Sequence, residues 1–250
     1  MLHAALDRRA DDILGAEHIG AHAFKRIVLR DRHVFQRSRV NHDIHAAPGI
    51  DTRVIAITED PLPNLSDVVE LPDGEIGELL IGGAVVSPEY KNRPAANAAS
   101  KVQGEGRIWH RTGDLVRRDE QGRLWFCGRK AHRLQTPAGM VPAVPVEGVF
   151  NGMPGVRWTA LVGVGPSGDE RPVLLVEMEQ GPEAFTDTVR NKLLARAANT
   201  RWDGVVQHAI AHPGFPVDAR HNSKIKREEL KRWAEQAVAN KPALIGAAAG

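Results

Sequence analysis

The chain has 250 residues, of which 42% are hydrophobic and 26% are charged, as is typical of a globular protein with one large domain or two small ones. Its 33 Lys and Arg nearly balance 31 Asp and Glu, so a net charge of +2 gives no electrostatic reason to expect a nucleic-acid partner. The single cysteine, Cys127, excludes an internal disulfide and any zinc site built from several thiolates.

The sequence contains no signal for a membrane or for export. No apolar run approaches the ~20 residues that span a bilayer, and the start MLHAALDRRADD lacks the apolar core of a secretory signal. One lone cysteine also fits a reducing compartment. We therefore expect a cytoplasmic protein without a transmembrane segment.

Residues 1–47 differ in composition from the rest and predict no regular element. They hold six of the eleven histidines and eight Lys and Arg. The segment is either an unrelated extension or a product of translation from a wrong start or frame, and the abrupt change at Pro48 favours the second. The pairs His18/His22 and His42/His45 have helical spacing, but without a matched third ligand we expect no metal site.

From Pro48 the chain predicts a β-rich subdomain that extends to residue 129. Short runs rich in strand-forming residues are separated by PLPNLSD and by the Asp73-Gly74 turn signal. A probable hairpin covers 118–127, with residues 119–122 as its loop. The predicted strands before the hairpin are 53–57 and 77–82.

Residues 130–240 predict a small α+β domain, and 241–250 a tail. A helix over 183–198 places Phe185, Val189, Leu193 and Ala197 on one face, and a last helix over 227–239 has an apolar stripe. A loop rich in Pro, Gly and His precedes the last helix. The predicted strands are 159–164, 173–178 and 205–210, which makes the whole chain α+β.

Three polar segments lie where strands and turns meet. In residues 109–115, the carboxylate of Asp114 can accept hydrogen bonds from both hydroxyls of a ribose, and Gly113 lets a ligand approach the backbone. Residues 128–133 and 220–227 are basic and suit phosphate. Taken singly, the first segment is better explained as a plain turn and the second as a solvated basic linker. The third is explained equally well as a basic lead-in to a surface helix.

The order of these segments changes their interpretation. TGDL, then GR at the end of a strand, then a Lys-Ile pair resembles the C-terminal portion of the acyl-adenylate-forming superfamily, which includes acyl-CoA synthetases and peptide synthetase adenylation domains. The resemblance covers about Pro48 to Val238 and includes GEIGEL and PVE. The runs RLWFCGRKAHR, PVEGVFN and FPVDARHNSKIKRE resemble the olefin β-lactone synthetase branch, whose members act on long-chain 3-hydroxy acids.

The resemblance implies an ATP-dependent, AMP-forming ligase that uses ATP with Mg²⁺ and a small-molecule carboxylic acid. Asp114 would bind the ribose hydroxyls, with Arg129 assisting. Lys224 would be the catalytic lysine that bridges carboxylate and phosphate during adenylation. The C-terminal domain is mobile in such enzymes, and its hinge would be Lys130. No metal-ligating residue is implied.

The second half-reaction is left open by the residues. In the lactone branch the 3-hydroxyl of the substrate attacks its own activated carbonyl, whereas in the synthetase branch the attacking group is the thiol of coenzyme A. Only the resemblance to the branch favours the lactone. Ser223 stands where the common pattern has Gly, and Lys130 stands where many members have Asp.

The phosphate loop and acyl pocket that such enzymes carry upstream are absent from residues 1–47. We therefore expect a C-terminal fragment that is inactive alone and needs an N-terminal half as partner. The alternative is a noncatalytic binding or interaction module that keeps the fold. Nucleic-acid binding through residues 220–232 is a weaker third reading. Structural roles are expected for Cys127 and for three tryptophans, namely Trp158, Trp202 and Trp233. Glu147 is expected to be a structural or a domain-docking carboxylate and not a catalytic one.

Overall fold

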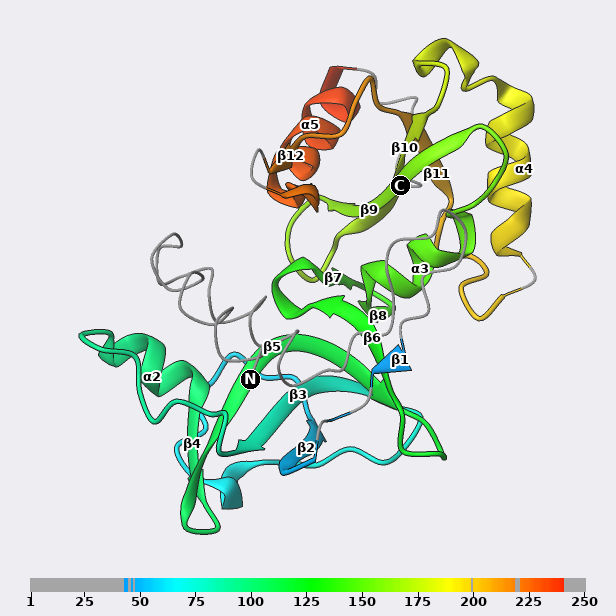
Figure 1. The fold of residues 1–250 in the computed structure, drawn as a ribbon. Coiled ribbons are helices and arrows are strands. Elements are labelled where there is room, and N and C mark those ends of the chain that lie inside the picture. The colour runs from blue at the N-terminus through cyan, green and yellow to red at the C-terminus, as the bar shows by residue number, and fades with distance from the viewer. Residues whose placement is uncertain (1–42, 45, 47, 199, 219–220, 241–250) are drawn as a thin grey trace, which may run out of the picture. The chain divides into compact units, whose positions relative to one another are not determined.

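The two largest sheets of the described residues have six and three strands, and their strands are labelled in Figure 1. Helices and strands together confirm the predicted α+β class. The division between the two units falls within one strand, after Phe126. The structure is a computed structural model that describes residues 43–44, 46, 48–198, 200–218 and 221–240, with the backbone alone for 43–44 and 221–224.

The first unit is built on a six-stranded sheet with the strand order β1-β6-β5-β3-β2, in which β4 also pairs with β5. A short helix, α2 (Pro94–Ser100), and a 3-10 turn, η1 (Leu65–Asp67), lie between strands. The strands are β1 (Asp43–Ile44), β2 (Ile50–Ile55), β3 (Ile76–Gly83), β4 (Lys101–Gly104), β5 (Arg107–Arg118) and β6 (Leu124–Arg129).

The apolar run of β3 is buried on both faces of this sheet. Leu79 and Ile81 pack in one cluster with Val116, while Leu80 lies in another with Trp109. Successive side chains of a strand point to opposite faces, so a continuous apolar sequence fits a strand that is covered on both sides. The predicted strand 77–82 is confirmed.

Two further predictions for the first unit meet the structure differently. The hairpin is confirmed, because β5 ends at Arg118 and β6 begins at Leu124. The strand predicted over 53–57 begins and ends earlier, as β2. It follows a turn at Gly49, where φ is 82°, and the amide of Ala56 leaves the ladder to donate to Val69 O at 2.8 Å.

The second unit contains a three-stranded sheet of order β11-β10-β9, with β9 antiparallel and β11 parallel to β10. Two small hairpins, β7–β8 and β12–β13, complete it. The elements are η2 (Lys130–His132), β7 (Leu134–Thr136), β8 (Gly139–Val141), α3 (Ala143–Phe150), β9 (Val156–Val164), β10 (Arg171–Met178), η3 (Pro182–Ala184), α4 (Asp187–Ala197), β11 (His208–Ala211), β12 (Val217–Asp218), β13 (His221–Ile225) and α5 (Arg227–Asn240).

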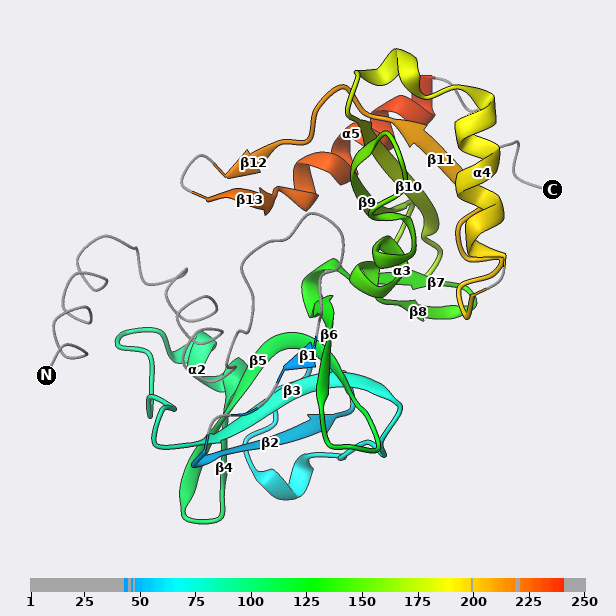
Figure 2. The same ribbon diagram turned by 45° about the vertical axis from the view of Figure 1, so that its right-hand side comes forward.

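Helices cover both faces of this second sheet, as the turned view of Figure 2 shows. Leu174 and Val176 of β10 pack in a cluster with residues of α3 and α4, whereas Val173 and Leu175 pack with α5. The predicted strands 159–164 and 173–178 and the last helix are confirmed. The predicted core tryptophans pack against these two clusters, as Trp158, Trp202 and Trp233.

Two predicted limits in the second unit are wrong for local reasons. The helix predicted from residue 183 begins at Asp187, because Thr186 Oγ1 accepts from the amide of Val189 as its N-cap. Residues 182–184 form the separate turn η3. The strand predicted over 205–210 begins later, as β11. Val205 is still in a turn, because its amide donates to Trp202 O at 3.1 Å.

Several predictions cannot be compared with the structure. The two histidine pairs and nearly all of residues 1–47 lie outside the described residues, as does the tail 241–250. Within the described part of the chain, no group of three His, Cys, Asp or Glu is arranged to hold a metal ion. In that same part, no helix is long and apolar enough to cross a membrane.

Candidate functional site

The TGD segment forms a bulge in the middle of β5. Glu78 of β3 pairs with Leu115, but Leu80 pairs with Arg111, so residues 112–114 stand opposite the single residue Leu79. Gly113 takes a φ of 67°, which favours glycine. A bulge bends a strand and re-aims its side chains, and such features are frequent beside active sites.

Hydrogen bonds hold the bulge in one conformation. Thr112 Oγ1 donates to Leu79 O at 2.9 Å and accepts from the amide of Asp114 at 3.0 Å. Glu78 Oε1 accepts from the amide of Gly113 at 3.2 Å. Asp114 itself is buried, with an exposed fraction of 7%. A carboxylate predicted to bind ribose is therefore carried by a rigid sheet and not by a loose turn.

An ion pair lies beneath the bulge. The guanidinium of Arg111 contacts Glu78 Oε2 at 3.2 Å through Nε and at 2.7 Å through Nη2. Its remaining donors reach Asp60 O at 2.8 Å and Thr58 O at 2.6 Å. Both charged side chains are almost fully buried, at 3% and 2% exposed. Glu78 thus neutralises Arg111 and also fixes Gly113.

A second cluster on the first unit lies where β4 meets β5. His110 pairs across the strands with Lys101, and the ring of Tyr90 contacts His110 edge-on at 6.1 Å. The Lys101 ammonium lies 4.8 Å from the Tyr90 ring centre and donates to Ser87 O at 2.7 Å. Burial lowers the pKa of Lys101. Sequence reasoning missed Lys101, because nothing in its local sequence marks it.

Residues 128–133, the junction segment, lie near the start of the stretch 127–250 of the second unit. Arg129 ends β6, and Lys130 begins η2, where its carbonyl accepts from Arg133 Nη1 at 2.7 Å. Gly128 has a φ of 118°, and a Cβ added there would lie 3.3 Å from Val144 Cγ2. Both the backbone conformation and the space therefore favour glycine before the predicted hinge.

The structure brings the junction segment next to the start of α5, 96 residues further along the chain. His132 Nε2 lies 2.9 Å from Glu228 Oε1. Burial lowers the pKa of His132, and the carboxylate of Glu228 opposes that effect. The polar segment 128–133 thus contacts the residue that directly follows the polar segment 220–227, within the second unit. Asp114 belongs to the first unit.

Lys224 lies in β13, which corrects the prediction that it lies on a loop. Val217 of β12 pairs with Ile225, and the amide of Lys226 donates to Pro216 O at 2.9 Å. The segment is rich in polar residues without period-2 alternation, so no strand signal was visible. A hairpin thus carries the predicted adenylation lysine immediately before α5.

Glu147 of α3, predicted to be a structural or a domain-docking carboxylate, contacts two other elements of the second unit. Its Oε1 accepts from the amide of Leu161 at 2.7 Å and from Arg227 Nη1 at 2.5 Å, and its Oε2 accepts from Arg227 Nη2 at 2.7 Å. Burial disfavours the charge of Arg227, but the negative charge of Glu147 outweighs burial and raises the pKa of Arg227. The partner of Glu147 was not predicted, because 80 residues separate the two in sequence.

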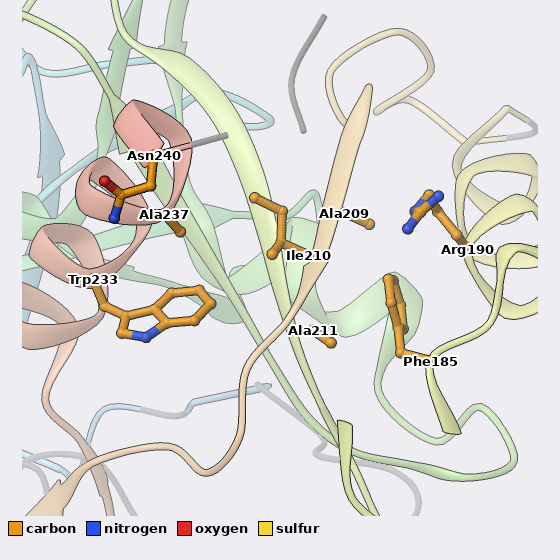
Figure 3. Close-up of a pocket in the computed structure, with 8 residues that line it drawn as sticks. All are labelled: Phe185, Arg190, Ala209, Ile210, Ala211, Trp233, Ala237 and Asn240. Carbon is orange, nitrogen blue, oxygen red and sulfur yellow. The ribbon is translucent and has the colours of Figure 1, made fainter. Parts of the chain in front are cut away.

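An open groove of about 400 Å³ lies elsewhere in the second unit, along β11 between α4 and α5 (Figure 3). Phe185 and Trp233 flank it, and small side chains such as Ala211 form its floor. Its one charged residue, Arg190, is already paired with Asp187 at 2.5 Å. The groove contains none of the predicted site residues and offers little that would bind a phosphate.

Comparisons with known proteins find relatives of the chain. It is 44% identical over 189 residues to an olefin beta-lactone synthetase of Stenotrophomonas maltophilia and 42% identical over 193 residues to that of Xanthomonas campestris pv. campestris. Each match covers 74% of this chain and 34% of the relative. A phenyloxazoline synthase MbtB of a Mycobacterium species is 34% identical over 191 residues.

Solved structures share the fold at lower identity. An ATP-bound RpMatB-BxBclM chimera matches with a TM-score of 0.61 and 24% identity, over 79% of this chain and 37% of that one. A benzoate CoA ligase of Burkholderia xenovorans matches with a TM-score of 0.58 and 23% identity, over 74% and 34%. At these identities the matches establish the fold alone. No family model matches the chain.

The match to the lactone synthetases spans only about a third of their length, and it agrees with the family that the three polar segments indicated. The structural neighbours have the same arrangement over a similar share of the chain. Over 74% of its length, the chain is therefore a homologue of the olefin beta-lactone synthetases, among the adenylate-forming enzymes.

Proposed function

We propose that this chain is the C-terminal portion of an ATP-dependent, AMP-forming ligase that activates a long-chain fatty acid or 3-hydroxy fatty acid. The observation that carries the proposal is the 44% identity to an olefin beta-lactone synthetase over 189 residues. The rigid bulge at Asp114 supports it, because nucleotide binding needs a carboxylate that is already in place before the ligand arrives.

In this proposal Asp114 accepts hydrogen bonds from the two ribose hydroxyls of ATP. The neighbouring Gly113 leaves room for the sugar, and Arg129 assists from the end of β6. An ionised carboxylate forms stronger hydrogen bonds than a neutral group, which suits a ligand that must stay oriented through two steps.

Lys224 acts in the first half-reaction. A carboxylate oxygen of the acid attacks the α-phosphorus of ATP, the bond to the β-phosphate oxygen breaks, and pyrophosphate leaves with its electron pair. Negative charge increases on the α-phosphate oxygens in the transition state. The ammonium of Lys224 stabilises that charge and holds the acid carboxylate against the phosphate.

The second half-reaction closes a β-lactone. The 3-hydroxyl oxygen attacks the acyl carbonyl, loses its proton, and AMP leaves. The thiol of coenzyme A would give a thioester from the same adenylate, so this cofactor stays a second candidate partner. The identity to lactone synthetases favours ring closure.

Domain motion links the two steps. We propose that residues 48–129 form the last subdomain of the large adenylating domain and that residues 130–240 form the mobile domain, which turns about Lys130. The phosphate-loop portion of the large domain would complete the ATP site. Mg²⁺ would enter with the phosphates of ATP, as it commonly does in enzymes that use a nucleoside triphosphate.

The test is AMP formation from ATP, Mg²⁺ and a 3-hydroxy fatty acid. The chain is assayed alone and with the separately expressed remainder of a lactone synthetase. We expect AMP only with that remainder, and a loss of roughly a hundredfold or more in Lys224→Ala. Lys226→Ala is the matched control, because Lys226 pairs with Glu229 at 2.9 Å on α5.

The outcomes separate the two candidate functions. AMP formation that depends on both the acid and Lys224 supports the ligase portion. AMP from the chain alone would contradict the expectation that it is inactive without its N-terminal half. A folded mixture that forms no AMP would favour the alternative, a noncatalytic module that retains the fold.

A further inference from the structure

The start of α5 is tied to α3 by one buried ion pair. Glu147 presents both carboxylate oxygens to the two terminal nitrogens of Arg227, at 2.5 and 2.7 Å. Their side chains are 7% and 16% exposed. Such a two-point contact fixes the direction of the guanidinium as well as its distance.

Glu147 is itself held in place. Its Oε1 also accepts from the amide of Leu161 in β9, at 2.7 Å, and the side chain projects from α3 next to the core residue Val146. Glu147 therefore connects three elements, α3, β9 and α5. A carboxylate with this many fixed partners cannot rotate without losing a buried hydrogen bond.

Arg227 is the first residue of α5 and follows Lys224 by three positions. Between them, the amide of Lys226 donates to Pro216 O, and Ile225 pairs with Val217. These backbone contacts join the end of β13 to its own hairpin partner, and the side chain of Ile225 packs against the core cluster that contains Leu230. The Glu147–Arg227 pair joins the same end of the strand to the body of the domain.

We propose that Glu147 and Arg227 are positioning residues for Lys224. The pair anchors the first turn of α5, and through two intervening residues it sets where β13 leaves the domain and hence where Lys224 is delivered. The functional meaning of this anchor rests on the proposed role of Lys224 in adenylation.

Amide hydrogen exchange on the full chain tests the anchor without requiring activity. We compare the native chain with Glu147→Gln, Arg227→Gln and Arg227→Lys, and follow residues 221–226 beside the core strand β10. Loss of a charged buried hydrogen bond predicts exchange of 221–226 that is roughly tenfold faster in both Gln variants. Arg227→Lys keeps the charge and should restore part of the protection.

Lys231→Gln is the matched control. Lys231 lies one turn further along α5 and pairs with the buried Glu170 at 2.5 Å. Its loss removes another ion pair to a buried glutamate from the same helix, at a position one turn away from the Lys224 end. We expect Lys231→Gln to leave exchange of 221–226 within about twofold of the native chain, whatever its effect on the unfolding temperature.

Equal acceleration of 221–226 in Glu147→Gln and Lys231→Gln would overturn the proposal, because the pair would then stabilise the domain without directing the strand. Unchanged exchange in both Gln variants would overturn it too. The AMP assay of Lys224→Ala fails or succeeds separately, so an error in the proposed function is distinguishable from an error in the anchor.

Discussion

Each unit of the protein has a buried pair of glutamate and arginine near a predicted site residue. The two pairs differ in how far they lie from the segment that carries that residue. Glu78 and Arg111 are on neighbouring strands of one sheet, and the bulge that they support lies between them. Glu147 and Arg227 join α3 to α5, and the strand β13 that carries Lys224 comes just before Arg227 in the chain.

This difference matters for what each motif can do. Asp114 is held by the ladder on one side, by Thr112 and by the Glu78 contact to Gly113, so it is fixed within the sheet. Lys224 lies on a two-stranded hairpin that is tied down at its α5 end. The proposed function needs both a ribose contact that stays in place and a lysine that can move between two steps.

The largest expected effect comes from Glu78→Gln. Arg111 would keep its charge in a site where its side chain is 3% exposed, and removing one partner of a buried pair typically costs about 3–5 kcal/mol. Urea unfolding measures the change. Glu70→Gln is the control, since Glu70 pairs with Arg53 at the surface and should cost about 1 kcal/mol or less. Equal losses of unfolding free energy in the two variants would show that the buried pair is no more stabilising than the surface pair.

Arg227→Gln should cost less, about 2 kcal/mol in urea unfolding, because part of the Arg227 side chain reaches solvent and the amide of Leu161 still serves Glu147. The loss should appear in the second unit. A cost equal to that of Glu78→Gln would show that the Glu147–Arg227 pair stabilises the protein as much as the Glu78–Arg111 pair.

Gly113→Ala should cost about 1–2 kcal/mol, because a side chain at a φ of 67° is strained. Gly148→Ala in α3 is the control. Nothing lies within 4 Å of a Cβ there, and alanine favours a helix, so a gain of about 0.5–1 kcal/mol is expected. A neutral Gly113→Ala would mean that the bulge tolerates a side chain.

The smallest effect is a difference in acid sensitivity between the units. Burial lowers the pKa of three histidines in the second unit, namely His132, His208 and His212. The unfolded chain then takes up protons first, so the second unit should lose stability as pH falls below the unfolded value of about 6.5.

The first unit should respond later. Burial raises the pKa of Asp119, but hydrogen bonds from Trp125 and Arg123 outweigh burial and hold that pKa well below its usual range. Its contribution is complete above an unfolded pKa of about 3.9 and is lost only below it. Hydrogen exchange at pH 7, 5.5 and 4.5 compares the units. Earlier loss in the first unit would contradict the assignment.

His212→Asn sharpens the same measurement. His212 Nδ1 accepts from the amide of Gly214 at 3.1 Å, and an asparagine oxygen can replace that acceptor without titrating near pH 6. The variant should reduce the acid response of the second unit. It also loses the ring contact to Trp233 at 4.4 Å, so its stability at pH 7 is the reference.

Much of the architecture was predictable from local pattern. The apolar run of β3, the turn residues between β5 and β6 and the stripe of α5 are short-range signals. Helix α3 was missed, because eight residues with a proline in the first turn give little periodicity. The strand β13 was missed because its hydrogen bonds to β12, and not its own sequence, define it.

The sequence alone was enough for the α+β class and for the likeness to the olefin beta-lactone synthetases, because turn chemistry, hydrophobic periodicity and motif order are written along the chain. It was also enough to nominate Asp114, Arg129 and Lys224. The folded chain added the partners, Glu78 for Arg111 and Glu147 for Arg227, which are 33 and 80 residues apart. Which charged groups pair depends on their distance in space and on their shared burial, and both are set only when the sheets and helices pack.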